Sequence, residues 1–529
     1  MTTYLNRIMI ILFAAIALAA CHKLDIPVST QLTPENFPQT EKQFIQAAGP
    51  TYTALRGNYA VQYWFLQSIS TDEAIMPARG GNWYDGARYE QIHKHTWNKD
   101  NGFLNDAWNW LTGVISNSNQ NLFLVEKGVP SPAKDRGIAE LRTMRSIAYF
   151  MMMDLFGNVP IVTKFGDTTR PTTTARKDVF AFIEKEVLAS LPFLSAATGS
   201  ATYGRPNKYT SHALLAKMYL NAEVYTGTPR YSDVVKMCDS IIGSNNYAVE
   251  SNYLAMFKPN NGPQIKEFIF AIPFDPAAGG GQMFYPRYNL YNGVVMRTKY
   301  SLAYTPSGPM STLPEFYALF NEPNDVRSSM WQTGKQYYHN GSPVIIATTK
   351  KGFDEDYTGS DGSASVNYHL EFTPDVVIKK AAIFDAGNDL KAWSMGYRLN
   401  KFYPDSTSTT RNQNTDLPIF RYSDILLMKA EAILRGAAAT NGQTPLSLVN
   451  EIRTKRSAAA WTAVNLQTLY EERSRELVSE NWHRNDMIRF GKFEGSWGVK
   501  TDNNVNKRIF PIPTPALQLN PNLTQNPGY

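Results

Sequence analysis

The chain has 529 residues, of which 43% are hydrophobic, and a formal net charge of +6. A chain of this length can bury a large core. So small a net charge does not indicate a nucleic-acid partner, because such proteins usually carry a concentrated basic surface. The sequence contains two cysteines, Cys21 and Cys238, and is rich in Trp, Tyr and Phe.

The N-terminus has the pattern of an export signal. Arg7 is followed by an apolar run, Ile8 to Leu18, and then by Ala19-Ala20-Cys21. The run is typical of a signal peptide and is shorter than the roughly 20 apolar residues of a transmembrane helix. Small residues directly before a cysteine resemble a bacterial lipobox. We therefore predict that residues 1–20 are removed and that Cys21 is acylated, leaving no pair of cysteines for an internal disulfide. The alternative is an ordinary secretory signal in which Cys21 has no special role.

The residues after the signal are predicted to form a tether followed by helices. Residues 21–40 are polar and lack a periodic pattern, so they read as a tether. Apolar residues then recur at helical spacing in several segments: 41–59, 101–127, 139–156, 177–194, 211–224 and 231–242. The helix at 139–156 is apolar on nearly every face, so it is expected to be buried, and Gly157 and Pro160 are expected to stop it.

The second half of the chain predicts an irregular insert and a return to helix. Residues 244–415 lose the helical period and contain short β-like runs at 268–272 and 344–346. Helical spacing returns at 421–435, 445–456 and 466–480. The paired helices at 211–224 and 231–242 are typical of tetratricopeptide repeats. We predict a mainly α fold in one domain, 41–529, in which a tetratricopeptide-type helical scaffold (41–243 and 416–529) brackets a loop-rich insert with a few short strands.

The sequence offers few candidates for catalysis, and we predict no catalytic, cofactor or metal site. Asp72 and Glu73 are the best carboxylates for the pair that a glycosidase needs, and the acidic loop 354–361 is a second candidate. His93 and His95 do not have the spacing of a helical metal motif. Glu472, Glu476 and Glu480 would repel one another on one helix face. We expect an ion-pair network there, relieved by Arg473, Arg475 and Arg484.

Several stretches together resemble the SusD/RagB family of outer-membrane nutrient-binding lipoproteins. They lie in the same order as in that family and cover both ends of the chain: AELRTMRSIAYFMMMDLFGNVPIV (139–162), YGRPNKYTSHALLAKMYLNAEVY (203–225), PIFRYSDILLMKAEAILRG (418–436), VNEIRTKR (449–456), ERSRELVSENWHRNDMIRFGKF (472–493), PIP (511–513) and QNPGY (525–529).

The resemblance implies the helical scaffold and also a partner. Members of this family work with a TonB-dependent, SusC-like outer-membrane transporter and capture glycans or other nutrients. They are not usually enzymes. The resemblance therefore implies a protein held in the outer membrane by its lipid and facing the outside of the cell.

Two loop segments have the composition that a sugar-binding surface needs, namely flat rings beside hydrogen-bonding groups. The first is 71–91, where Trp83 and Tyr84 are flanked by Arg79, Asn82 and Asp85. The second is 279–293, with the following residues: Tyr285, Arg287, Tyr288, Asn289 and Tyr291.

Three functions follow from these patterns. The leading prediction is a non-enzymatic capture protein for an oligosaccharide or other nutrient, with no nucleic-acid partner. The alternatives are a surface hydrolase that uses the carboxylates named above, and a scaffold that only stabilises the transporter. One variant would separate capture from the scaffold role: full transport after the combined substitutions Trp83→Ala, Tyr84→Ala and Tyr288→Ala would favour the scaffold.

Overall fold

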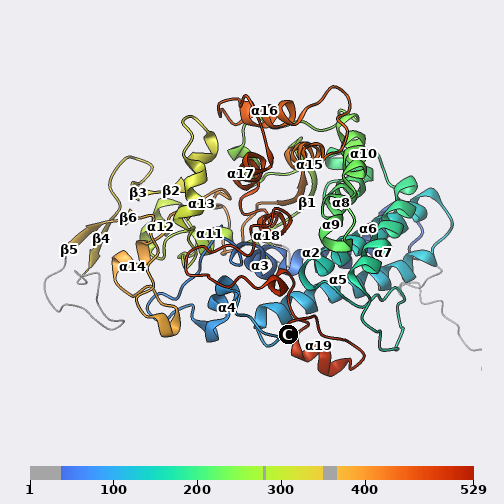
Figure 1. Ribbon diagram of the computed structural model, residues 1–529, viewed down its shortest axis with the longest axis horizontal. Coiled ribbons are helices and arrows are strands. Elements are labelled where there is room, and N and C mark those ends of the chain that lie inside the picture. Colours follow the sequence, from blue (N-terminus) through green and yellow to red (C-terminus); the bar gives the residue numbers. More distant parts are fainter. Residues whose placement is uncertain (1–36, 278–281, 349–365) are drawn as a thin grey trace, which may run out of the picture.

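The structure is a computed structural model that describes residues 37–277, 282–348 and 366–529 (Figure 1). The predicted signal peptide, Cys21, most of the tether and the acidic loop 354–361 lie outside these residues. Helices dominate the described chain and the strands are short, which confirms the predicted mainly α fold.

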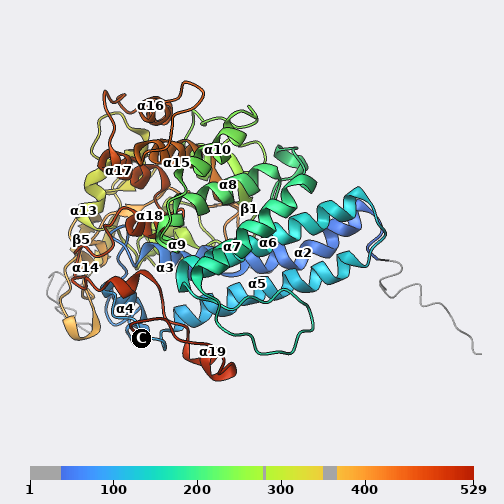
Figure 2. The same ribbon diagram turned by 45° about the vertical axis from the view of Figure 1, so that its right-hand side comes forward.

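The first half of the chain forms long helices that pack side by side. α2 (Glu41–Asn58) begins at a capping box, in which the Thr40 side chain accepts from the Gln43 amide and the Gln43 side chain accepts from the Thr40 amide. Figure 2 shows α2 lying along α5 (Gly102–Glu126) and α6 (Pro132–Phe156), with α7 (Arg176–Ser190) beside α6. The remaining helices of this half are α3 (Trp64–Ser68), α4 (Arg88–Lys94), α8 (Lys208–Leu220), α9 (Ala222–Thr226) and α10 (Tyr231–Ile242). α8 packs against α10, as the predicted helix pair requires.

α6 is the central helix of this bundle. Every residue from Thr143 to Phe156 is buried, in agreement with a sequence that is apolar on nearly every face. The helix starts earlier than predicted, because Ser131 caps its N-terminus with a bond from the Lys134 amide. It ends at Gly157, whose φ of 68° lies in the left-handed region that glycine adopts readily.

The C-terminal helices close the scaffold. They are α15 (Tyr422–Leu434), α16 (Pro445–Lys455), α17 (Leu466–Leu477), α18 (His483–Arg489) and α19 (Thr514–Leu519). α15 packs on α10 and thereby joins the two halves of the helical scaffold. α17 stops before the predicted end at residue 480, because Val478 leaves the helical conformation (φ −50°, ψ 131°).

In its described residues, the middle of the chain contains short helices and, together with the strand that follows it, four two-stranded antiparallel pairs. β1 (Phe268–Ile272) pairs with β8 (Leu417–Arg421), and β4 (Ile345–Thr348) pairs with β5 (Val366–His369). The other strands are β2 (Trp331–Gln332) with β7 (Arg398–Leu399), and β3 (Gly334–Lys335) with β6 (Glu371–Phe372). The short helices are α11 (Tyr285–Asn289), α12 (Val294–Lys299), α13 (Pro314–Tyr317) and α14 (Leu390–Ser394). Both predicted β-like runs therefore form strands.

The three glutamates of α17 and the turn after it lie in a buried ionic network, as expected. Their pairs are Glu472 with Arg327, Arg453 and Arg475, Glu476 with Arg327, Arg421 and Arg456, and Glu480 with Arg421 and Lys401. Of the three arginines proposed from sequence, only Arg475 pairs with these glutamates. Arg473 pairs with Asp424 and Asp486 instead, and Arg484 donates to the Arg508 carbonyl. The prediction was wrong for Arg473 and Arg484, because most of the residues that pair with these glutamates come from segments far away along the chain.

Candidate ligand-binding surface

The loop between α3 and α4, residues 79–88, is here called the aromatic loop. Trp83, Asp85 and Ala87 all have positive φ, of 71°, 44° and 65°, although none is glycine. Such residues cost free energy and persist where the surrounding structure holds them, often at functional sites. The loop therefore needs strong anchors.

Arg79 is the first anchor. Its side chain is fully buried, and its guanidinium donates to the carbonyl of Ala392, to that of Met395 at 3.1 Å and to that of Pro309 at 3.4 Å. Burial lowers the pKa of Arg79 to about 10. The structure thus places Arg79 beneath the loop, bound to backbone, rather than at the surface where sequence analysis expected it to contact ligand.

Asp385 is the second anchor, and it was not predicted from the sequence. Its carboxylate accepts from the Gly81 amide at 2.6 Å and from the Gly80 amide at 3.2 Å. The Gly387 amide donates to the same carboxylate at 2.6 Å. A side chain at residue 80 would not fit, because its Cβ would lie 2.4 to 2.9 Å from atoms of Asn388. A distant part of the chain thus fixes the base of the aromatic loop.

The two predicted loop segments meet at Trp83. Its ring meets the edge of Tyr288 with 5.6 Å between centroids, and the guanidinium of Arg287 lies 5.8 Å from the Trp83 centroid. Tyr89 also packs against the indole, with 6.3 Å between the ring centroids. Segments 71–91 and 279–293 therefore form one surface, although the sequence alone did not link them.

The predicted ligand residues differ in their access to solvent. Asn82 and Asp85 are exposed, and Trp83 and Tyr84 are half-buried. Asp85 accepts from Arg88 at 2.8 Å. By contrast, Tyr285, Tyr288 and Tyr291 are 1%, 6% and 3% exposed. Tyr285 stacks on Trp64 with centroids 3.9 Å apart, and Tyr291 belongs to a separate hydrophobic cluster. The structure gives these three tyrosines packing positions, and the open part of the surface consists of Asn82, Trp83, Tyr84, Asp85 and Arg287.

The carboxylates of Asp72 and Glu73 have internal partners. Asp72 lies 2.6 Å from Nε2 of His483. Glu73 is buried, accepts from the Ser68 hydroxyl at 2.6 Å and from the Ser479 amide at 3.1 Å, and burial raises its pKa. Neither group is placed to flank a sugar as the carboxylates of a glycosidase do.

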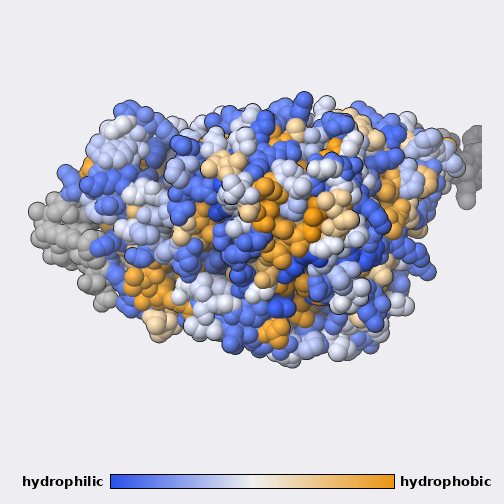
Figure 3. All heavy atoms as spheres, turned by 45° about the horizontal axis from the view of Figure 1, so that its top comes forward, coloured by the Kyte–Doolittle hydropathy of each residue, from blue (hydrophilic) through white to orange (hydrophobic). Residues whose placement is uncertain are grey.

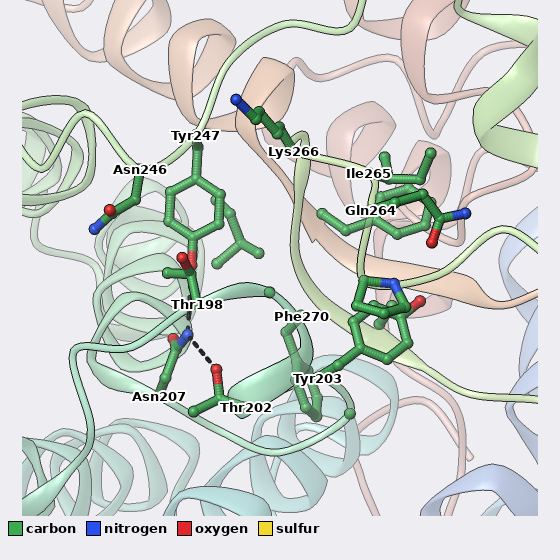
Figure 4. Close-up of a pocket in the computed structure, with 16 residues that line it drawn as sticks. Thr198, Thr202, Tyr203, Asn207, Asn246, Tyr247, Gln264, Ile265, Lys266 and Phe270 are labelled. Atoms are coloured by element: carbon green, nitrogen blue, oxygen red, sulfur yellow. Dashed lines mark hydrogen bonds between the residues drawn. The ribbon is translucent and has the colours of Figure 1, made fainter.

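A second hollow, here called the α8 pocket, was not found by sequence reasoning (Figure 4). It has a volume of about 280 Å³ and lies where the loop before α8 meets β1. Its lining residues are Thr198, Gly199, Thr202, Tyr203, Gly204, Asn207, Asn246, Tyr247, Pro263, Gln264, Ile265, Lys266 and Phe268 to Ala271. These residues come from three separate parts of the chain, so no single stretch of sequence indicates the pocket.

The described residues contain no group of three or more His, Cys, Asp or Glu side chains that could hold a metal ion. Within the same part of the chain, no helix has the length and apolar character needed to cross a membrane. On the face shown in Figure 3, hydrophobic side chains form separate patches among hydrophilic ones. Apolar atoms make up much of the surface of any folded protein, so the candidate surface is identified by its geometry and not by hydrophobicity.

Comparisons with known proteins agree along most of the chain. Residues 266–529 match the model of the SusD family, and residues 42–220 match a model described as starch-binding associating with outer membrane. The chain is 25% identical to the starch-binding protein SusD of Bacteroides thetaiotaomicron over 509 residues, covering 87% of this chain and 84% of that protein. A SusD-like protein of Bacteroides ovatus is 22% identical over 94% of this chain and 86% of its own length.

Solved structures show the same fold. A SusD superfamily protein from Parabacteroides distasonis superposes with a TM-score of 0.70 at 21% identity, covering 94% of this chain and all of that one. Surface glycan-binding protein A from Bacteroides thetaiotaomicron, solved with laminarihexaose, gives a TM-score of 0.68 at 18% identity, covering 92% and 99%.

Proposed function

The chain belongs to the SusD family, and we propose that it captures glycans at the surface of the outer membrane without changing them chemically. The observation that carries this proposal is the aromatic loop, which presents Trp83 and Tyr84 beside Asn82, Asp85 and Arg287. Two relatives support it, because one is a starch-binding protein and the other is a surface glycan-binding protein solved with laminarihexaose.

The chemistry of the surface suits a sugar. A sugar ring has C–H groups on its flat faces and hydroxyls around its rim, so it binds well to an aromatic face beside polar groups. Trp83 is held on its edge by Tyr288 and Tyr89, which leaves little side-chain freedom to lose when a ligand binds. The amide of Asn82 and the Asp85–Arg88 pair lie in the same loop and supply donors and acceptors for hydroxyl groups.

We also propose the partners that complete capture. Acylation of Cys21 would hold the protein in the outer membrane, on the side that faces outward, and a SusC-like TonB-dependent transporter would receive the glycan. Holding a bound oligosaccharide above the transporter raises its local concentration there. Mass spectrometry of the purified lipoprotein tests for lipid on Cys21. Copurification of a transporter with the tagged, lipidated chain tests the partnership.

Two alternatives from sequence analysis carry less support. A surface hydrolase would need two available carboxylates, whereas Asp72 and Glu73 are held by His483, Ser68 and Ser479; the acidic loop 354–361 lies outside the described residues. A scaffold that only stabilises the transporter would not need the strained aromatic loop.

The deciding experiment measures binding of the full-length protein to a panel that contains starch, laminarin and other polysaccharides. Affinity electrophoresis and calorimetry should show binding to at least one member, with no new reducing ends released. Absence of binding to every member would overturn glycan capture. Release of reducing ends that is lost in Asp72→Asn or Glu73→Gln would establish the hydrolase instead.

A further inference from the structure

The α8 pocket lies apart from the aromatic loop and shares no residue with it. Its walls come from the loop before α8, the turn after α10 and the segment that leads into β1. The pocket volume of about 280 Å³ is near the lower end of the range for small-molecule sites, roughly 300 Å³ and above. The pocket therefore suits a ligand of the size of one ring rather than a long chain.

Aromatic rings form the walls of the pocket. In Figure 4, Tyr247 stands on one side, with Tyr203 and Ile265 on the other and Phe270 between them. Tyr247 and Phe270 are 8% and 3% exposed, and both line the hollow. Ring faces of this kind bind the C–H faces of a sugar.

The floor of the pocket is rigid. Asn207 caps α8 by accepting from the amides of Tyr209 and Thr210, while its amide group donates to the Thr202 hydroxyl at 3.3 Å and to the Tyr247 hydroxyl at 3.4 Å. The Tyr203 hydroxyl donates to Asp416 at 2.6 Å. These bonds hold both tyrosines in place before a ligand arrives, which lowers the entropic cost of binding.

The rim of the pocket carries polar groups with unused bonding capacity. In the described part of the chain, the Thr198 hydroxyl, the Gln264 amide oxygen and the Lys266 ammonium group bond to no other protein group, whereas Nε2 of Gln264 donates to the Asn260 carbonyl. Lys266 is also the one charged side chain in the lining. The lining thus offers several neutral donors and acceptors that suit the hydroxyl groups of a sugar, and the exposed Lys266 ammonium group can donate to them as well.

We propose that the α8 pocket is a second carbohydrate subsite that takes one neutral sugar unit between Tyr247 and Tyr203, with hydroxyls bonded by Thr198, Gln264 and Lys266. The choice of a sugar rests on the proposed function, whereas the existence of a ligand site rests on the pocket itself. A glycan that engages both the aromatic loop and the α8 pocket would bind more tightly than at either one, because the second contact is intramolecular.

Saturation-transfer NMR of the full chain tests this subsite, using the methyl glycosides of glucose, galactose, mannose and N-acetylglucosamine as probes. At least one glycoside should bind. Thr198→Trp, which fills the pocket, should lower its affinity at least tenfold, and Tyr247→Phe should lower it less. Ala201→Trp is the matched control, because Ala201 is exposed in the same loop but does not line the pocket. This variant should keep wild-type affinity.

The outcomes separate the two proposals. If no glycoside binds, or if Trp83→Ala abolishes glycoside binding while Thr198→Trp leaves it intact, the subsite is overturned even when polysaccharides bind the aromatic loop. If polysaccharides fail to bind, but a glycoside binds and this binding is lost only in the Thr198→Trp variant, the subsite stands and the proposed function fails. Circular dichroism of each variant establishes that it is folded.

Discussion

The indole of Trp83 and the ring of Tyr288 meet edge to face, with 5.6 Å between their centroids. Tyr288 belongs to α11 and is buried, whereas Trp83 sits in a loop with a left-handed backbone and is half-buried. The contact therefore gives a half-buried ring a fixed orientation. A preorganised ring binds a flat ligand at a lower entropic cost than a mobile one.

Trp83→Ala should weaken glycan binding. Loss of an aromatic anchor at a binding surface typically costs about 1–3 kcal/mol, which corresponds to roughly a fivefold to 150-fold increase in Kd. Calorimetry with the polysaccharide that binds the wild type gives the Kd. Phe165→Ala is the control, because Phe165 is 48% exposed on another surface, and its Kd should match the wild type. Equal Kd values for wild type and Trp83→Ala would remove Trp83 from the site.

Asp385→Ala should loosen the aromatic loop. The substitution leaves the amides of Gly80, Gly81 and Gly387 without their acceptor, at a cost of about 1–3 kcal/mol. Hydrogen exchange at Gly80 and Gly81 should become faster, and glycan affinity should fall. Asp385→Asn keeps one acceptor oxygen, so its effects should be intermediate. Unchanged exchange in Asp385→Ala would show that the loop is held by other contacts.

Glu476→Gln should strongly destabilise the fold. Glu476 is buried and pairs with Arg327, Arg421 and Arg456, so the variant leaves positive charges uncompensated. Breaking a buried pair in this way costs about 3–5 kcal/mol. Denaturant unfolding measures the loss, with Glu471→Gln as control, since Glu471 lies on the same helix but is only partly buried. Similar losses for both variants would contradict a special role for the network.

The same network predicts acid sensitivity. Burial alone would raise the pKa of Glu472, but the charges of Arg327, Arg475 and Arg453 outweigh it and lower the pKa to about 2. Its pKa in the unfolded chain is about 4.3. The stability due to Glu472 is thus present above pH 4.3 and is lost as the pH falls toward 2. Unfolding free energies measured from pH 6 to 2 should show this loss, and Glu472→Gln should show a shallower slope.

His95 predicts a separate effect nearer to neutral pH. Burial lowers the pKa of His95 to about 2, while its Nε2 lies 2.8 Å from the Ser70 carbonyl oxygen. The unfolded chain takes up this proton near pH 6.5, so stability should fall as the pH drops below that value, by up to about 1.4 kcal/mol per pH unit. His95→Gln should be less stable at pH 7 but flatter in its dependence between pH 6.5 and 4.5. A slope equal to that of the wild type would exclude this residue as the cause.

The scaffold was largely predictable from the sequence, because its signals are local. Each signal lies within one short stretch of sequence, as for the mostly apolar helix from Thr143 to Phe156, its end at Gly157 and the strand at 268–272. The candidate surface was predictable only in part. Trp83 and Tyr84 stood out as loop aromatics, but Asp385 could not be found, because its role depends on a contact with amides some 300 residues away along the chain.

Burial was also hard to predict for the remaining candidates. Arg79 and Tyr285 have the residue types of a ligand site, yet one binds backbone carbonyls and the other stacks on Trp64. The α8 pocket could not be predicted for the opposite reason. Asn207, Tyr247 and Lys266 have ordinary sequence surroundings and form a pocket only when three segments of the chain come together.

The pairing of β1 with β8 bears on how such a chain can diversify. The two strands are antiparallel neighbours, with Ile272 opposite Leu417, so the segment of residues 273–416 leaves the helices and returns to them at the same place. Segments whose ends lie close together can be lengthened, shortened or exchanged with little effect on the body that carries them. The loops of this segment could therefore be traded between relatives, giving a new binding surface on an unchanged set of helices. Such an exchange would have to keep Arg327 and Lys401, because they pair with Glu472, Glu476 and Glu480 in the buried network.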